Sequence, residues 1–229
     1  MAQPWKIIES VSTAEGILEL RQRGERDFLI MIGSQVLMNS LANRSEVMLG
    51  HYGCCHLEGL AGSRVLLAGL GMGCTLRGAL DTLPSDAQIV VAELNPVVAE
   101  WCRGPLATLT ARAVADSRVT LEICDVMTLI RDAARSGGSS RFDAIILDLY
   151  RGPGAYSDRL NDPFYGSRAI ETMRAALNSG GVLAVWGENY DEGYAQRLRK
   201  AGFTVTSRRP GRGGLRHVVF HGRLPGQCA

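Results

Sequence analysis

Polar residues and glycines stand at the ends of four short apolar runs, where a strand would end and a loop begin. In order along the chain these residues are Gly69, Gly71 and Gly73, then Glu93, then Asp125 with Val126, and then Asp148. The carboxyl ends of parallel strands meet at one edge of a sheet, so we expect these positions to border a single crevice. Carboxylates placed there can accept hydrogen bonds from a ligand and can hold a proton.

The spacing of the glycines and acids favours a ligand that carries an adenosyl group. Three glycines at every second position let the backbone turn sharply and let a ligand lie against the main chain. Glu93 follows about 20 residues later, where an acid commonly accepts hydrogen bonds from ribose hydroxyls. Asp125 could accept the adenine amino proton, or it could cap a helix that begins at Val126, and both readings stay open. The glycines do not match G-x-G-x-x-G in full and no second mononucleotide-binding half follows, so the pattern favours S-adenosylmethionine over a dinucleotide.

Asp148 and the aromatic residues that follow it are the candidates for the chemistry. No helix is expected to begin before about residue 164, so Asp148 has no helix to cap and could instead orient an attacking amine and act as its general base. The rings of Tyr150, Tyr156 and Tyr165 could surround a sulfonium cation. For Trp5 and Trp186, which could also do so, we favour packing roles.

The elements that would position these residues alternate from residue 64 onward. Short apolar runs such as 64–70, 88–94 and 142–149 are separated by amphipathic stretches, as in a parallel sheet covered on both faces. Runs 203–209 and 215–222 predict a closing antiparallel hairpin. We therefore predict a doubly wound, mostly parallel α/β sheet of the Rossmann-like, class I methyltransferase type over residues 59–229. Residues 1–58 are predicted to form a small β cap and a linking helix.

Composition excludes several classes of protein. The 229 residues carry a formal net charge of only +2 and are 46% hydrophobic, which argues against a nucleic-acid partner or a membrane surface. No apolar run reaches the ~18 residues of a spanning helix, and the first residues do not resemble a signal peptide, so a cytoplasmic location is expected. The six cysteines show no disulfide framework and the four histidines show no metal-ligand spacing. We expect a small-molecule substrate and no metal.

The chain resembles the spermidine synthase family of aminopropyltransferases over most of residues 27–190. The resemblance lies in AGLGMGCTLR, AELNP and FDAIILD, in Phe-Tyr at 164–165 and in Gly-Glu at 187–188. It implies the class I methyltransferase fold, an adenosyl ligand and a catalytic role for Asp148. It also places Gln35 near the acceptor site, with Ser45, Glu46 and His51 close by in the sequence, although the family's Gln and His-Glu elements do not align cleanly. By this resemblance alone, a homodimer through the N-terminal strands is expected.

Two departures from the family pattern argue against ordinary spermidine synthesis. Met72 stands where the family's glycine loop usually has an Asp that helps to bind the amine of decarboxylated S-adenosylmethionine. The family's second acid after the run 142–148 is replaced by Arg151, which would repel a polyamine and pair with a carboxylate. We therefore expect putrescine to be a poor acceptor and Arg151 to be a partner for the carboxylate of intact S-adenosylmethionine.

Three functions remain open at this stage. In the first, an amine attacks the side-chain carbon next to the sulfonium and methylthioadenosine is released. The amine belongs either to a separate acceptor or to the same molecule. Attack within the same molecule gives azetidine-2-carboxylate, as in azetidine-2-carboxylate synthases, which this chain resembles in size and general type. The second is a small-molecule methyltransferase that leaves S-adenosylhomocysteine. The third is a non-catalytic adenosyl-binding subunit, which the presence of Asp148 disfavours.

Overall fold

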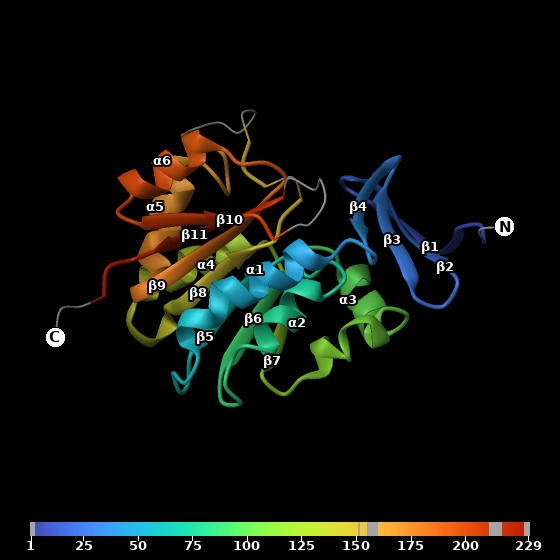
Figure 1. Cartoon of the computed structure of the whole chain (residues 1–229), viewed down its shortest axis with the longest axis horizontal. Coiled ribbons are helices and arrows are strands. Elements are labelled where there is room, and N and C mark those ends of the chain that lie inside the picture. Colours follow the sequence, from blue (N-terminus) through green and yellow to red (C-terminus); the bar gives the residue numbers. More distant parts are fainter. Residues whose placement is uncertain (1–2, 151, 155–159, 211–216, 227–229) are drawn as a thin grey trace.

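The chain folds into two sheets with helices on both faces of the larger one (Figure 1). The computed structural model describes residues 3–150, 152–154, 160–210 and 217–226. Within these residues a seven-stranded sheet has the order β10-β11-β9-β8-β5-β6-β7. Its strands are β5 (Arg64–Ala68), β6 (Gln88–Glu93), β7 (Val119–Ile123), β8 (Phe142–Leu147), β9 (Leu177–Gly187), β10 (Thr204–Arg208) and β11 (Val218–Arg223). Strands β5 to β9 pair in parallel, which confirms the predicted doubly wound α/β sheet.

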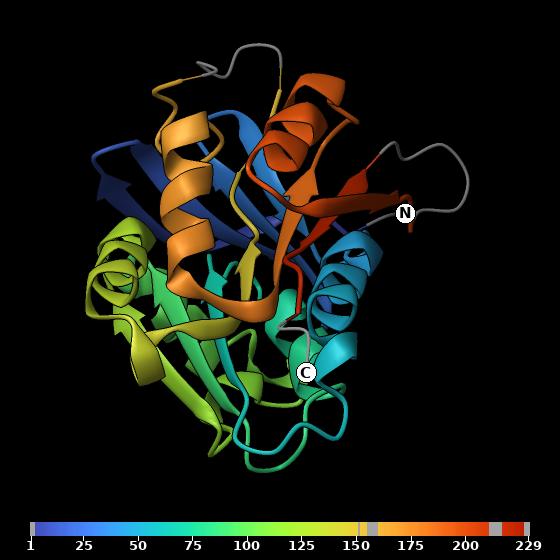
Figure 2. The same ribbon diagram turned by 90° about the vertical axis from the view of Figure 1, so that its left-hand side faces the viewer.

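The sheet divides the core into two layers because side chains alternate along each strand. On β5, Val65 and Leu67 face one layer, whereas Leu66 and Ala68 face the other. The first layer is covered by α1 (Arg44–Cys54), α2 (Cys74–Leu80) and α3 (Pro96–Arg103). The second is covered by α4 (Val126–Ser136), α5 (Ser167–Ala176) and α6 (Glu192–Lys200), two of which lie in front of the sheet in Figure 2. Short 3₁₀ turns lie at Cys55–Leu57, Ala107–Thr110, Ala113–Ala115 and Gly138–Ser140.

The predicted hairpin is confirmed, because β10 and β11 pair antiparallel and β11 pairs antiparallel with β9. The sequence pattern predicts a helix over 164–178 and a strand over 182–188, but strand β9 already begins at Leu177. Leu177 pairs with Phe142, and the side-chain amide of Asn178 donates a hydrogen bond to the carboxylate of Asp143 at 2.7 Å. These contacts keep this segment in the sheet, although the helical periodicity assigns it to the preceding helix.

The N-terminal strands form a separate four-stranded antiparallel sheet that lies over the carboxyl edge of the large sheet (Figure 1). Its strands are β1 (Lys6–Thr13), β2 (Gly16–Arg23), β3 (Asp27–Ile32) and β4 (Gln35–Asn39). Leu18, Leu20, Phe28 and Ile30 from this small sheet belong to the same apolar cluster as α2 and α3. The small sheet therefore shares its core with the large one.

Helix α1 follows the small sheet and packs closely on α2. A Cβ atom at Gly50 would collide with the backbone of Thr75 and Ala79, and one at Gly78 would collide with the backbone of Val47. Glycine at both positions lets the two helices approach to backbone contact. The predicted linking helix is thus part of the layer over the large sheet. The division into units 1–58 and 59–229 stays a prediction.

No helix in the described part of the chain has both the length and the apolar character needed to cross a membrane.

Candidate functional site

The glycine turn after β5 lies directly beside the end of β8. Gly69, Gly71 and Gly73 all have positive φ angles, of 85°, 52° and 79°. A side chain at Gly69 would collide with the carbonyl oxygen of Asp148, and one at Gly71 would collide with the Sδ atom of Met38 from the small sheet. Close backbone approach therefore requires glycine at Gly69, whereas at Gly71 the neighbour is a flexible side chain and the positive φ angle favours glycine. The turn is enclosed by β8 on one side and by the small sheet on the other.

Glu93, at the end of β6, holds this turn in place. Its Oε2 atom accepts a hydrogen bond from the backbone N–H of Leu70 at 2.9 Å, and its Oε1 atom accepts one from the N–H of Asn95 at 2.9 Å. The residue is only 7% exposed. Each carboxylate oxygen has a second lone pair, so Glu93 can still accept a hydrogen bond from a ribose hydroxyl.

Asp125 caps α4, which is one of the two roles left open for it. Its Oδ1 atom accepts the backbone N–H of Met127 at 2.9 Å, as an N-cap residue does. Val126 begins the helix and is buried against the second layer of the core. The ligand role of Asp125 stays a prediction.

Asp148 follows β8 and points toward α2. Its Oδ2 atom accepts a hydrogen bond from the hydroxyl of Thr75 at 2.5 Å. The residue is partly buried, and desolvation together with the nearby carboxylate of Glu46 raises the pKa of Asp148 to about 7, although the bond from Thr75 opposes the rise. A carboxyl group with this pKa can both accept and release a proton near neutral pH.

Glu46, Ser45 and His217 meet next to Asp148. Ser45 donates a hydrogen bond to Oε2 of Glu46 at 2.5 Å, and its Oγ atom lies 3.0 Å from Nδ1 of His217. The ring of His217 packs edge-on against Trp186 with 4.8 Å between centroids. The indole N–H of Trp186 is buried and has no acceptor among the described residues. Sequence reasoning placed Ser45 and Glu46 near the site but missed His217, which comes 172 residues after Ser45.

Tyr150 and Gln35, two of the candidate site residues, lie in contact with one another. The hydroxyl of Tyr150 donates a hydrogen bond to Oε1 of Gln35 at 2.9 Å, which links the loop after β8 to the start of β4. Tyr150 is 49% exposed. The pair therefore joins the large sheet to the small one, and a role of either residue in binding an acceptor stays a prediction.

Other candidate residues lie elsewhere. Tyr165 was expected near the sulfonium, but the structure places it in the second layer of the core, where its ring meets Tyr194 edge-on at 5.8 Å. Its apolar surroundings on the side of α5 and α6 explain the burial. Met72 is fully buried in the first layer. Arg151 and Tyr156 lie outside the described residues, so their predicted roles stay predictions.

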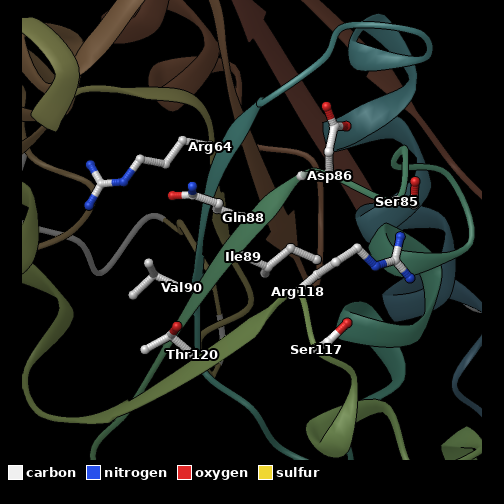
Figure 3. A pocket seen from close by; sticks show the side chains of 10 residues that line it. Arg64, Ser85, Asp86, Gln88, Ile89, Val90, Ser117, Arg118 and Thr120 are labelled. Carbon is white, nitrogen blue, oxygen red and sulfur yellow. The ribbon is translucent and has the colours of Figure 1, made fainter.

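A hollow of about 370 Å³ lies at the opposite, amino edge of β5, β6 and β7 (Figure 3). Arg64 and Arg118 line it but point away from one another. Arg118 is bound to Asp116 and to the backbone carbonyls of Leu80 and Leu83. These hydrogen bonds occupy the guanidinium group of Arg118. The hollow does not continue the site at the carboxyl edge. Among the described residues, no three His, Cys, Asp or Glu side chains gather so as to hold a metal ion.

Comparisons with known proteins agree with this arrangement. The chain is 33% identical to the spermine synthase SPE4 of Saccharomyces cerevisiae over 121 residues, which cover 52% of this chain and 38% of that protein. It is 33% identical to a polyamine aminopropyltransferase of Mycobacterium tuberculosis over 148 residues, which cover 62% of this chain and 27% of that protein. The matches thus span well under half of the length of these relatives. No protein-family model matches the chain.

Solved structures extend the likeness over nearly the whole chain. The spermidine synthase from Thermotoga maritima superposes with a TM-score of 0.71 and 17% identity, covering 95% of this chain and 72% of that one. A spermidine synthase in complex with the transition-state analogue AdoDATO gives a TM-score of 0.67, with 18% identity and the same coverage. The chain therefore has the fold of a spermidine synthase, and about half of its sequence is similar to that of aminopropyltransferases.

Proposed function

We propose that the chain is a transferase of the aminopropyltransferase type, in which an amine attacks the side-chain carbon next to the sulfonium of an S-adenosylmethionine-type substrate. The new N–C bond forms as the C–S bond breaks, and the sulfur keeps the electron pair, so that neutral methylthioadenosine leaves. The amine proton passes to the carboxylate of Asp148. The observation that supports this function is the place of Asp148, whose backbone touches the glycine turn and whose pKa is raised to about 7.

Intact S-adenosylmethionine is the proposed donor. Met72 supports this choice, because a fully buried thioether in the core leaves no carboxylate at that point of the glycine turn to bind the amine of a decarboxylated donor. The expected partner of the donor's carboxylate is Arg151. The nucleophile is then either the α-amine of the donor itself, which closes a four-membered ring to azetidine-2-carboxylate, or the amine of a separate acceptor.

One assay distinguishes the alternatives. The protein is incubated with S-adenosylmethionine or with its decarboxylated form, each with and without putrescine, and the nucleoside products are identified by mass spectrometry. Methylthioadenosine and a C4 amino acid from intact S-adenosylmethionine alone support cyclisation. Brisk aminopropylation of putrescine would instead show an ordinary polyamine synthase. S-adenosylhomocysteine would show a methyltransferase, and binding without any product would rule out cyclisation.

Two variants test the assigned roles. Asp148→Asn keeps the shape of the side chain but removes the proton acceptor, so turnover should fall about 100-fold or more while ligand affinity changes little. Glu93→Ala should instead weaken ligand binding, since it removes the ribose acceptor and the bond to the N–H of Leu70. Turnover in Asp148→Asn equal to that of the unaltered protein would contradict the role of Asp148.

A further inference from the structure

The side chain of Glu46 is held by a short series of hydrogen bonds. The single hydroxyl hydrogen of Ser45 goes to Oε2 of Glu46 at 2.5 Å. The Oγ atom of Ser45 must then accept from its other neighbour, so Nδ1 of His217, 3.0 Å away, carries a hydrogen. The two contacts therefore fix the position of the Glu46 carboxyl group, and the residue is only 8% exposed.

Thr75 connects Glu46 to Asp148. Its Oγ1 atom lies 2.5 Å from Oδ2 of Asp148 and 3.1 Å from the backbone carbonyl oxygen of Glu46. A hydroxyl has one hydrogen, so it cannot donate to both oxygens at once. Both contacts become hydrogen bonds when Asp148 is protonated, because Asp148 then donates to Thr75 and Thr75 donates to the carbonyl of Glu46. Thr75 can therefore bond to Asp148 in either protonation state, as a donor to the carboxylate or as an acceptor from the acid.

In the described part of the chain, no ion pair involves Glu46 or Asp148. Among the same residues, the titratable groups next to them are Cys74 from α2 and, through Ser45, His217 from the segment before β11. Burial raises the pKa of Cys74 to about 12, so its thiol stays neutral. Two carboxyl groups that share such a place do not both ionise at little cost.

We propose that Glu46 is a positioning residue of this site: Ser45 and His217 hold its carboxyl group in place, and its charge favours a proton on Asp148. The charge of Glu46 thereby contributes to the raised pKa of Asp148. Once Asp148 has lost this proton, its carboxylate is a stronger base and accepts the proton of an attacking amine. The use of this pair in a reaction rests on the proposed function, whereas the protonation of Asp148 does not. The two claims can therefore fail separately.

The test is a ¹³C NMR titration of the side-chain carboxyl groups without substrate, with the Asp148 signal assigned by its loss in Asp148→Asn. In Glu46→Gln the titration midpoint of Asp148 should move about one pH unit lower, because the like charge is gone while desolvation remains. Ser45→Ala should move it in the same direction by less, and Ser45→Thr, which keeps the hydroxyl, should restore it. An unchanged midpoint in Glu46→Gln would overturn the proposal.

A matched control lies on the same helix. His51 on α1 contacts the hydroxyl of Thr82 at 2.9 Å through Nδ1, as His217 contacts Ser45, but with no carboxylate beyond it. His51→Gln should leave the midpoint of Asp148 unchanged.

If Glu46→Gln does not fold, the Ser45 variants decide, and an unchanged midpoint in Ser45→Ala then overturns the proposal. Where methylthioadenosine forms, the acid limb of the rate profile should move to lower pH with the NMR midpoint. A shifted midpoint without any product would overturn the proposed function alone.

Discussion

The carboxyl group of Asp148 is partly buried between the glycine turn, Thr75 and Glu46, where little water can solvate its charge. Its pKa of about 7 in the folded chain lies well above that of an unfolded aspartate. Between these two pKa values the folded state binds more protons than the unfolded state. Stability therefore falls as the pH rises from about 4 to about 7, and the loss is complete above pH 7.

Asp148→Asn should remove this pH-dependent loss. The variant keeps an acceptor for Thr75 but carries no charge, so its free energy of unfolding should exceed that of the unaltered protein at pH 8 by about 1–3 kcal/mol, since one pKa unit corresponds to about 1.4 kcal/mol and partial exposure reduces the effect. The gain should vanish below pH 4. Urea denaturation at the two pH values measures it, with Asp132→Asn on the exposed face of α4 as the control. A variant less stable at pH 8 would contradict the raised pKa.

Sequence spacing finds those site residues that follow strands, and it misses those that only the tertiary fold brings in. The glycines, Glu93 and Asp148 meet at one edge because parallel strands end there. His217 reaches Ser45 only through the return of β11 beside β9, and nothing in its own neighbourhood in the sequence shows this. For Tyr165 the sequence position after Asp148 suggests the crevice, whereas its ring packs against Tyr194 in the core.

At the scale of elements, the contact between α1 and α2 positions both Glu46 and Thr75. The helices touch at Gly50 and Gly78, where any Cβ atom would enter the backbone of the other helix. Alternating apolar runs predict the strands, since burial on both faces leaves a clear sequence signal. They do not predict this helix crossing, because glycine within a helix carries no indication of which partner it approaches.

Gly78→Ala should push α1 away from α2. The new methyl group would collide with the carbonyl oxygen of Val47, so we expect a loss of about 1–3 kcal/mol in the free energy of unfolding, although alanine is the better helix former. Turnover should fall as well, because Thr75 and Glu46 lie on the two helices that separate.

Gly193→Ala is the matched control for that substitution. Gly193 lies within α6, and a Cβ atom there would meet only the ends of the Asp191 and Arg197 side chains. This variant should be as stable as the unaltered protein or up to about 1 kcal/mol more stable. Equal stability of the two glycine variants in urea denaturation would show that the helices do not depend on close approach.

At the scale of the whole molecule, three contacts tie the small sheet to the carboxyl edge of the large one. Met38 packs against Gly71, Tyr150 bonds to Gln35, and the indole of Trp101 on α3 donates to the carboxylate of Glu9 at 2.7 Å. The candidate site lies between the two sheets. Loss of the small sheet would therefore remove one wall of the site.

The shared core predicts that both sheets unfold in a single transition. In a variant with Trp101→Phe and Trp186→Phe, the fluorescence of Trp5, which lies under the guanidinium of Arg23, reports the small sheet, while far-ultraviolet circular dichroism reports mainly the large domain. Leu20 packs in the common apolar cluster. Adding Leu20→Ala should therefore lower the free energy of unfolding by about 2–5 kcal/mol and move both urea midpoints down together. Because Trp101→Phe also removes the bond to Glu9, coincident transitions would show that the shared apolar core alone couples the two sheets. A Trp5 signal that changes at lower urea than the dichroism would show that this core does not suffice to hold the small sheet.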